Sequence, residues 1–522
     1  MNSKSAPPLT RKAPVSRSYS AMRTWVASLA FTIATMITGF VVAPILLEVI
    51  GKERFGLSRT LTEVFAYLGL VGQGITISLV PRLASAAGQG DRGLLDRCLS
   101  VGLRLYATVA LFLIVLGLAL APFLGRLLHI EPAFRPELRN AWLICLCGLP
   151  LLCLSVMKVL VEIAHLGYVT NLLMAAQGVL ATLLSIVLVL AGWGVVGVMS
   201  AILFTAIGFN LATTIAACRL YPNLIRSIKD ARPTREDWKS VLTISGPTLV
   251  ALVSERIGIL SDSIVLTRVS GLAAAATLFF TQRLAGIGFG VLNSIALAVW
   301  PSLAELYARR ELKTLCVRLI ELTRLVGVLG IAGFAPMVAY NSLFITRWVG
   351  AQQDGGRAIA IVAAINGIGL TLLAIYNTAL VTTGQVSRLA KSAAISAVLN
   401  ITLSFFFASW LGPIGPVLGT LVAILCVQAW FVPLLLRRIF GVSCRSLLWA
   451  VTVPLLWGVP YAAFLSWLAD SHTPPGWFGL LGEMGLASLL FLGFGVRVIF
   501  GPEDRQLWNQ RLLQPLLKKF SK

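Results

Sequence analysis

The chain has 522 residues, of which 57% are apolar and 12% are charged, and its mean hydropathy is +0.86. These values exclude a soluble protein and indicate a polytopic membrane protein. A formal net charge of +22 would suggest a nucleic-acid partner for a soluble chain. In a membrane protein, the distribution of Lys and Arg along the loops reports topology instead, so we expect no nucleic-acid partner.

Apolar stretches long enough to cross a bilayer follow one another along nearly the whole chain. A hydrocarbon core of about 30 Å needs roughly 20 apolar residues per helix. Fourteen such stretches lie near residues 24–49, 60–80, 101–124, 141–161, 170–192, 195–217, 240–266, 272–300, 321–345, 358–381, 387–410, 414–436, 447–468 and 477–500. We therefore predict an all-α membrane protein with about 14 transmembrane helices.

The placement of positive charge predicts the orientation of these helices. With the N-terminus inside, 32 of the 43 Lys and Arg residues fall in the tails and inner loops, nine fall in outer loops, and Arg256 and Arg283 lie within spans. The positive-inside rule then places both termini in the cytoplasm. We expect a multi-pass protein of the plasma (inner) membrane, with membrane lipids as partners of its basic N-terminal tail.

No residue pattern in the sequence indicates a catalytic, metal or cofactor site. The eight cysteines avoid the predicted outer loops, and the three histidines are scattered along the chain. Neither a Walker A pattern nor a Ser/His/Asp set is present. We expect no catalytic residue, no metal and no cofactor, and hence a protein that is not an enzyme.

The sequence predicts an internal duplication. Val80-Pro81-Arg82-Leu83-Ala84 recurs 220 residues later as Trp300-Pro301-Ser302-Leu303-Ala304. At the same offset Glu63 aligns with Arg283 and Gln73 with Asn293. An indel of five residues aligns Gly56-Leu57 with Gly271-Leu272, and offsets near 218 align Gly194 and Gly197 with Gly412 and Gly415. Six helices thus map onto the next six, and their pseudo-two-fold axis runs along the membrane normal.

The duplication divides the chain into two six-helix lobes with further segments around them. The predicted parts are a basic cytoplasmic tail, the N-terminal lobe, a cytoplasmic linker, the C-terminal lobe, helices 13 and 14, and a cytoplasmic tail. Their boundaries are residues 1–23, 24–217, 218–239, 240–436, 437–500 and 501–522.

Polar residues at membrane depth are the candidate functional residues, because each ionised group there costs at least about 2.5 kcal/mol on insertion scales. They are Glu63 and Gln73 in the second predicted helix, Glu255, Arg256 and Asp262 in the seventh, and Arg283 and Asn293 in the eighth. Two interpretations stay open. The charges either neutralise one another as ion pairs, or the arginines bind an anionic group while an acidic residue takes up a proton or Na⁺.

Several short motifs in order along the chain resemble those of the polysaccharide and O-antigen flippases of the multidrug/oligosaccharidyl-lipid/polysaccharide exporter superfamily. They are Leu46-Leu47-Glu48-Val49-Ile50-Gly51-Lys52-Glu53-Arg54-Phe55-Gly56-Leu57 in the expected loop after helix 1, Asp262, Gln282-Arg283-Leu284, Trp300-Pro301, Trp348-Val349-Gly350 and Thr383-Gly384-Gln385. The motifs are degenerate, so the likeness lies in their order and in the number of helices.

The resemblance implies two lobes around a central cavity that moves an undecaprenyl-pyrophosphate-linked oligosaccharide from the inner to the outer leaflet by alternating access. Such transport serves lipopolysaccharide or exopolysaccharide export, with a glycan polymerase or export machinery as further partners. Members commonly line the cavity with cationic residues, a role open here to Arg256 and Arg283, with Gln73 and Asn293 as other cavity residues. The paired arginines near helix 1 that mark lipid II flippases are absent from the sequence.

Three alternatives remain at the level of sequence. An ion-coupled exporter of drugs or organic cations from the same superfamily would need an acidic cavity, and helix 1 offers only Glu48 at its outer end. A membrane-embedded polysaccharide polymerase or ligase would be expected to show a long outer loop, and none is predicted. A scaffold without transport would tolerate neutralisation of every buried charge.

Overall fold

The computed structural model describes residues 17–383 and 386–500, and within them every element is helical. The all-α architecture is therefore as predicted. The described chain divides into two compact units, residues 17–276 and the described residues of 277–500, each treated by itself below. This division lies at a different place from the predicted 218–239 linker. The linker marks a sequence duplication rather than a compact unit, so the predicted lobe boundaries stay a prediction.

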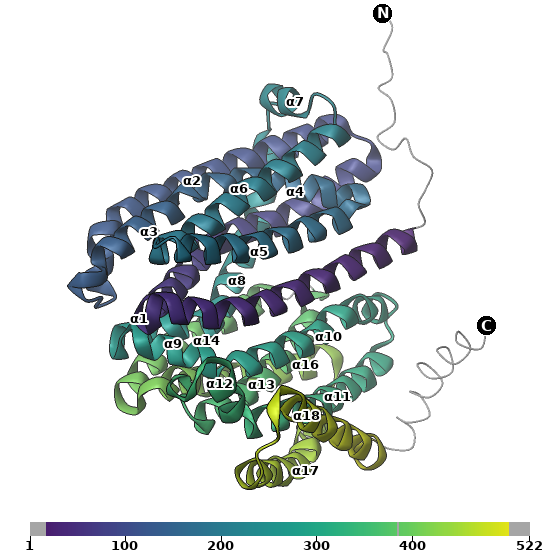
Figure 1. The fold of residues 1–522 in the computed structure, drawn as a ribbon. Helices are drawn as coiled ribbons and strands as arrows, with labels where there is room; N and C mark the ends of the chain where they lie inside the picture. The colour runs from purple at the N-terminus through teal and green to yellow at the C-terminus, as the bar shows by residue number, and fades with distance from the viewer. Residues whose placement is uncertain (1–16, 384–385, 501–522) are drawn as a thin grey trace, which may run out of the picture. The chain divides into compact units, whose positions relative to one another are not determined.

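The first unit consists of long helices joined by short turns (Figure 1). Its helices are α1 (Arg17–Gln89), α2 (Arg92–Leu127), α3 (Arg135–Cys147), α4 (Ser155–Val161), α5 (Gly167–Leu190), α6 (Gly194–Leu220), α7 (Leu224–Asp230) and α8 (Arg235–Ser270), followed by the start of α9 (Leu272–Thr281). A 3₁₀ segment, Leu149–Leu154, and a π-helical turn, Glu162–Leu166, flank α4.

The second unit continues from α9 with helices of similar length. They are α10 (Arg283–Ala308), α11 (Leu312–Ala339), α12 (Asn341–Val349), α13 (Arg357–Val381), α14 (Val386–Leu411), α15 (Gly415–Ala423), α16 (Ala429–Phe440), α17 (Cys444–Ser471) and α18 (Gly476–Phe494). π-helical turns follow α15 at Ile424–Gln428 and α18 at Gly495–Ile499.

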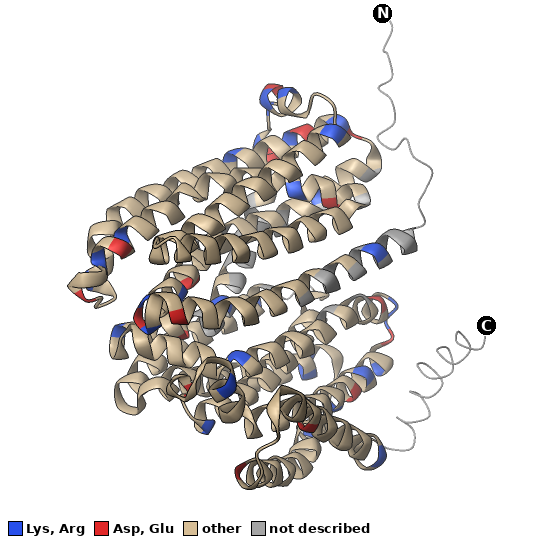
Figure 2. Cartoon of the chain, in the orientation of Figure 1, with Lys and Arg blue, Asp and Glu red and all other residues tan. Residues whose placement is uncertain are grey.

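The predicted spans coincide with helices. Each of the fourteen stretches is helical over nearly all of its length, and ten helical segments of the described chain are long and apolar enough to cross a membrane. The number of crossings therefore stays a prediction. Charged residues are sparse along these helices: α5 carries none, and Figure 2 shows it in tan, without blue or red.

The loop expected after the first predicted helix is not a loop. Residues 52–59 continue as helix, and a single residue, Gly51 (φ 81°, ψ 166°), breaks the path of α1. Only glycine adopts this backbone conformation without strain, because it has no Cβ. One glycine therefore turns the chain between the first and second predicted helices.

The backbone repeats at the same 220-residue offset that relates Pro81 to Pro301. Gly51 (φ 81°, ψ 166°) corresponds to Gly271 (φ 88°, ψ 174°), so the alignment needs no indel, and the predicted match of Gly56 with Gly271 is wrong at the level of conformation. The turn after α1 and the turn after α10 also match. Gly90 (φ 71°) and Arg310 (φ 58°) are the left-handed residues of two turns with the same backbone hydrogen bonds.

The later landmarks of the duplication recur as well. Gly194 and Gly412 both have positive φ, 53° and 65°. Three residues further on, a Cβ on Gly197 would meet Leu188, and one on Gly415 would meet the backbone of Ala408. Each glycine therefore lets a helix pack closely against the end of the preceding helix, and the two halves use the same device.

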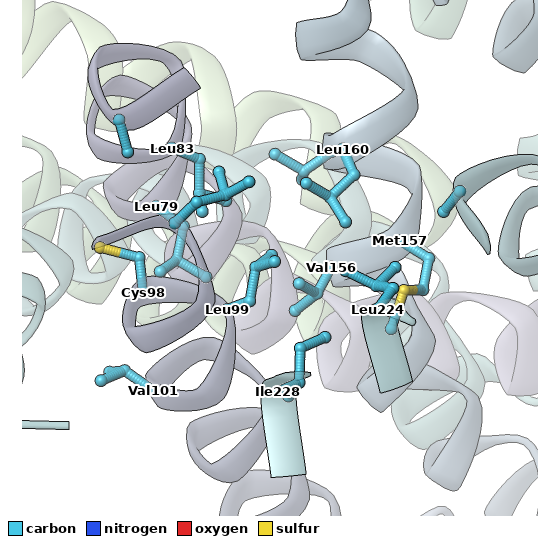
Figure 3. Close-up of a cluster of buried hydrophobic side chains, with 14 of the residues drawn as sticks. Leu79, Leu83, Cys98, Leu99, Val101, Val156, Met157, Leu160, Leu224 and Ile228 are labelled. Atoms are coloured by element: carbon cyan, nitrogen blue, oxygen red, sulfur yellow. The ribbon is translucent and has the colours of Figure 1, made fainter. Parts of the chain in front are cut away.

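A buried apolar cluster holds the predicted inner end of the first unit together. Leu99 of α2 lies between Leu79 of α1 and Val156 of α4, and Leu224 and Ile228 of the short α7 complete the cluster (Figure 3). The connection before α8 is thus part of the core. The second unit buries the residues at offset 220: Leu303, Leu315 and Leu319 correspond to Leu83, Leu95 and Leu99, and all six are at most 2% exposed.

Helices α17 and α18 lie outside the duplication. Polar contacts near the turn between them join them to the rest of the second unit. Arg357 of α13 forms a bidentate pair with Asp470, Arg347 donates to the carbonyls of Pro474 and Gly476, and Tyr340 donates to Glu483 over 2.9 Å. α11 and α17 also pack closely, because Gly327 of α11 lies against Pro454 of α17 and Gly458 of α17 lies against Ile331 of α11. The two helices are therefore a fixed part of this unit.

Candidate functional site

A polar seam joins α1 to α8 inside the first unit. Positions 56, 60, 63 and 67 of α1 lie on one helix face, because they are spaced by four, three and four residues. Their partners, on α8 and the first residue of α9, run in the opposite direction. A Cβ on Gly56 would lie 2.1 Å from the Leu272 carbonyl oxygen, and the Thr60 and Thr267 hydroxyls are 2.8 Å apart. Further along, Ser263 donates to Glu63, and Tyr67 donates to the Arg256 carbonyl over 3.4 Å.

Glu63 is the buried acidic group of this seam. Its side chain accepts a hydrogen bond from the Ser263 hydroxyl over 2.9 Å, and the Arg59 guanidinium lies 3.5 Å from the same carboxylate oxygen. The residue is 7% exposed, and its other oxygen is buried with no hydrogen-bond partner among the described residues. A carboxylate in such a place is stabilised chiefly by the nearby cation, because burial alone would penalise its charge.

Asp262 lies next to Ser263 on α8 and is 8% exposed. Tyr67 brings the two acids into one neighbourhood, because its side chain hydrogen-bonds to Ser261 and interacts electrostatically with both Glu63 and Asp262. Two predicted ion-coupling residues, one on α1 and one on α8, therefore both lie near Tyr67. The side chain of the third, Glu255, lies outside the described residues.

The predicted anion-binding residues are more dispersed. Arg256 is exposed on α8, one turn and a half from Asp262, and Gln73 is exposed on α1. Arg283 begins α10 in the second unit, half-buried, with its guanidinium 5.7 Å from the Phe279 ring centroid. Asn293 is half-buried on the same helix, about 15 Å further along its axis at 1.5 Å per residue.

Repeat-related positions differ in charge and in the partner they use. Glu63 pairs with Arg59, four residues earlier on α1, whereas Arg283 lies over Phe279, four residues earlier in the chain. An ion pair in one half thus corresponds to a cation–π contact in the other. The duplicated scaffold places an acid in the first half and a base in the second.

Several members of the seam were missed at the level of sequence. Thr60, Tyr67, Ser263 and Thr267 are uncharged, and the search at membrane depth rested on charge and amides. The 56, 60, 63, 67 spacing of small and polar residues on one face of an apolar helix was the available signal. The described residues contain no group of three or more His, Cys, Asp or Glu placed to hold a metal ion.

Comparison with known proteins identifies the family. The sequence profile described as "Polysaccharide biosynthesis protein" matches residues 21–307, more than half of the chain. The chain belongs to this polysaccharide biosynthesis family. The family resemblance drawn from the sequence motifs is thereby confirmed. No curated protein matches the sequence.

Solved structures of a lipid II flippase and of MOP superfamily transporters have the same fold as this polysaccharide biosynthesis family member. "Lipid II flippase MurJ, inward closed conformation" aligns with 90% of this chain and 99% of its own, at 16% identity and a TM-score of 0.68. An outward-facing multidrug resistance MATE family transporter aligns with 88% and 99%, at 18% identity and 0.53. A superfamily transporter from Pyrococcus furiosus aligns with 89% and 99%, at 14% identity and 0.56. At these identities the likeness concerns the fold alone.

Proposed function

We propose that the protein is a flippase that moves a lipid-linked oligosaccharide, carried on undecaprenyl pyrophosphate, from the inner to the outer leaflet of the plasma membrane. The family match over residues 21–307 carries the proposal, because it links the chain to polysaccharide biosynthesis. The structural neighbours support it, because the fold is one that lipid and drug transporters share. Both termini are cytoplasmic in this proposal, following the positive-inside rule.

In this proposal Arg256 and Arg283 bind the pyrophosphate. The planar guanidinium group donates in pairs to phosphate oxygens and keeps its charge at any physiological pH, so it suits a site that must attract a diphosphate into a membrane-embedded cavity. Gln73 and Asn293, aligned by the duplication, supply neutral donors and acceptors for the glycan. Glu63, Glu255 and Asp262 supply the acidic groups that take up a proton or Na⁺ as the transporter reorients.

The seam between α1 and α8 suits a gate in alternating access. The two helices belong to different halves of the predicted duplication, and hydroxyl and carboxylate contacts join them at the predicted outer end. A hydroxyl contact of this kind exchanges for water at a modest net cost of about 1 kcal/mol, and the carboxylate contact at about 1.5 to 3 kcal/mol. A gate of this composition opens more readily than an apolar one of the same area.

An ion-coupled exporter of organic cations is the second candidate. Two observations favour it: MATE transporters are among the structural neighbours, and Glu63 and Asp262 are two buried acids near Tyr67 at predicted membrane depth. The arginines at membrane depth favour the flippase, because they would repel a cationic drug. A polymerase or ligase and a transport-dead scaffold remain weaker alternatives that the same experiment addresses.

The deciding experiment compares a deletion strain with complemented strains. Loss of surface polysaccharide, with lipid-linked precursor accumulating on the cytoplasmic side, is expected on deletion. Arg256→Ala and Arg283→Ala should restore less than a tenth of export, although the variants insert and run as folded protein. Arg309→Ala, which changes the exposed arginine directly after α10, should restore export fully. Undiminished export by both cavity variants overturns the anion site, and drug sensitivity without precursor accumulation favours the exporter.

A further inference from the structure

A groove runs along the C-terminal half of α18 in the second unit, away from every residue assigned above. Its volume is about 320 Å³, and its lining residues are Leu489, Leu490, Gly493, Phe494, Arg497 and Val498. The volume is at the lower end of the range that small ligands occupy, about 300 to 1,000 Å³. Five of the six residues are apolar, and the cation lies at one end.

A glycine and an aromatic ring shape the groove on the surface of α18. A Cβ on Gly493 would meet no heavy atom within 4 Å, so this glycine leaves a depression in the helix surface. Phe494 forms one wall and is fixed by Trp457 of α17, with ring centroids 5.2 Å apart at an interplanar angle of 65°. The lining residues all belong to α18 and the turn that follows it, and the contact with Trp457 fixes the ring of one of them.

Arg497 is placed at the end of the groove by a change in helix geometry. α18 ends in a π-helical turn, Gly495–Ile499, that closes with a hydrogen bond from the Phe500 amide to the Gly495 carbonyl over 3.1 Å. Gly495 packs so closely on α11 that a Cβ would lie 2.6 Å from Val328. The wide turn is thus anchored on one side, and the exposed Arg497 is carried on the other side, next to Gly493 and Phe494.

The predicted orientation gives this end of α18 a particular chemical environment. In the predicted topology it is the cytoplasmic end, and the sequence of residues 501–522, outside the described residues, holds five Lys and Arg residues and two acids. The cytoplasmic leaflet carries anionic lipids whose phosphates lie at the level of such residues. An apolar groove that ends in an arginine at this level matches a molecule with an acyl chain and an anionic phosphate.

We propose that the groove binds an anionic glycerophospholipid, with one acyl chain along Leu489, Gly493 and Phe494 and its phosphate on Arg497. The site is distinct from the transport residues; it rests on the proposed orientation of the termini and not on the proposed flippase activity. Bound lipid would fill the depression that Gly493 leaves beside Phe494.

The test uses the full-length chain purified in a mild detergent and presented with mixed micelles of phosphatidylglycerol and phosphatidylethanolamine. Lipid that remains after washing is counted by native mass spectrometry. Arg497→Gln should lower retained phosphatidylglycerol about fivefold, the factor expected for one basic residue at an anionic membrane surface. Gly493→Leu should lower it similarly by filling the groove while keeping the charge. Arg445→Gln, at the exposed inner end of α17, is the matched control and should change retention less than twofold.

Three other results would count against the lipid site. If Arg497→Gln lowers retention and Gly493→Leu does not, the arginine attracts lipid as a surface charge and the groove is not a site. If phosphatidylethanolamine is retained equally, the phosphate contact is not selective. If Gly493→Leu abolishes a dimer that the unmodified protein forms, the groove holds a second copy of the chain. Size-exclusion profiles identical to that of the unmodified protein show that both variants are folded.

Discussion

The Glu63 carboxylate contacts a hydroxyl from α8 and a guanidinium from its own helix, so its effect on stability is measurable through its partners. We expect Glu63→Ala to cost about 1.5 to 3 kcal/mol, because a charged hydrogen bond and an ion pair are lost in a buried place. Ser263→Ala should cost less. Since both substitutions remove the same contact, the double variant should lose about 1 kcal/mol less than the sum of the two. Thermal unfolding in detergent measures all three, and strictly additive losses would count against the contact.

Gly51 and Arg310 provide a second residue-scale comparison, because both have positive φ but only one is glycine. Gly51→Ala should destabilise the protein by about 1 to 3 kcal/mol, since its φ and ψ fall in a region that residues with a Cβ enter only with strain. Arg310→Gly should be neutral or slightly stabilising, because it relieves a left-handed arginine while giving the unfolded chain more freedom. Melting temperatures of the purified variants test the contrast, which fails if both shift in the same direction by the same amount.

At the scale of elements, the N-terminus of α8 is fixed by a capping box. Thr234 accepts from the Asp237 amide over 3.2 Å, and Asp237 accepts from the Thr234 amide and hydroxyl over 2.8 Å each. Arg97 of α2 lies 3.5 Å from the same carboxylate. Thr234→Ala and Asp237→Ala should each destabilise the protein by about 1 kcal/mol. Ser443→Ala, which removes the longer 3.4 Å cap of α17, should cost less.

The capping box also predicts a dependence on pH. Burial alone would raise the pKa of Asp237, but hydrogen bonds from Thr234 and the charge of Arg97 outweigh it, so the pKa lies below the ordinary value for aspartate. A depressed folded-state pKa stabilises the protein above the unfolded-state pKa, and this stabilisation is lost as the pH falls through the folded value. The stability difference between the natural protein and Asp237→Asn should therefore shrink between about pH 5 and pH 3. A difference that stays constant over this range would contradict it.

Hydropathy located the helices well and the polar contacts poorly, for physical reasons. Length and apolarity identify a helix that must satisfy its backbone inside lipid, so stretches such as 170–192 and 358–381 were predicted to within a few residues. The Gly51 bend was not, because one glycine leaves the apolar run on either side intact. The Thr60–Thr267 contact was also missed, because the partner of a lone hydroxyl depends on which helices are neighbours.

At the scale of the molecule, the duplication was predictable and its register was only partly so. Pro81 and Pro301 gave the offset of 220, and the structure repeats the backbone at that offset from Gly51 and Gly271 to the turns at Gly90 and Arg310. The predicted indel came from matching Gly56 to Gly271 by residue identity. Backbone conformation decides which glycine corresponds to Gly271. Gly56 is in regular helix and packs closely on Leu272, whereas Gly51 makes the bend.

If the α1–α8 seam is a gate, a covalent bond across it should stop transport. The Thr60 and Thr267 hydroxyls are 2.8 Å apart, close enough for cysteines at these positions to form a disulfide. In a background with the eight natural cysteines replaced, oxidised Thr60→Cys/Thr267→Cys protein should flip lipid-linked oligosaccharide in vesicles at less than a tenth of its reduced rate. Reduction should restore the rate, because opening requires α1 and α8 to separate. The matched controls are the single variants Thr60→Cys and Thr267→Cys in the same background, which cannot form the bond and should transport at the same rate before and after oxidation. Reduced protein that fails to flip would count against the flippase, whereas oxidised protein that still flips would count against the gate alone.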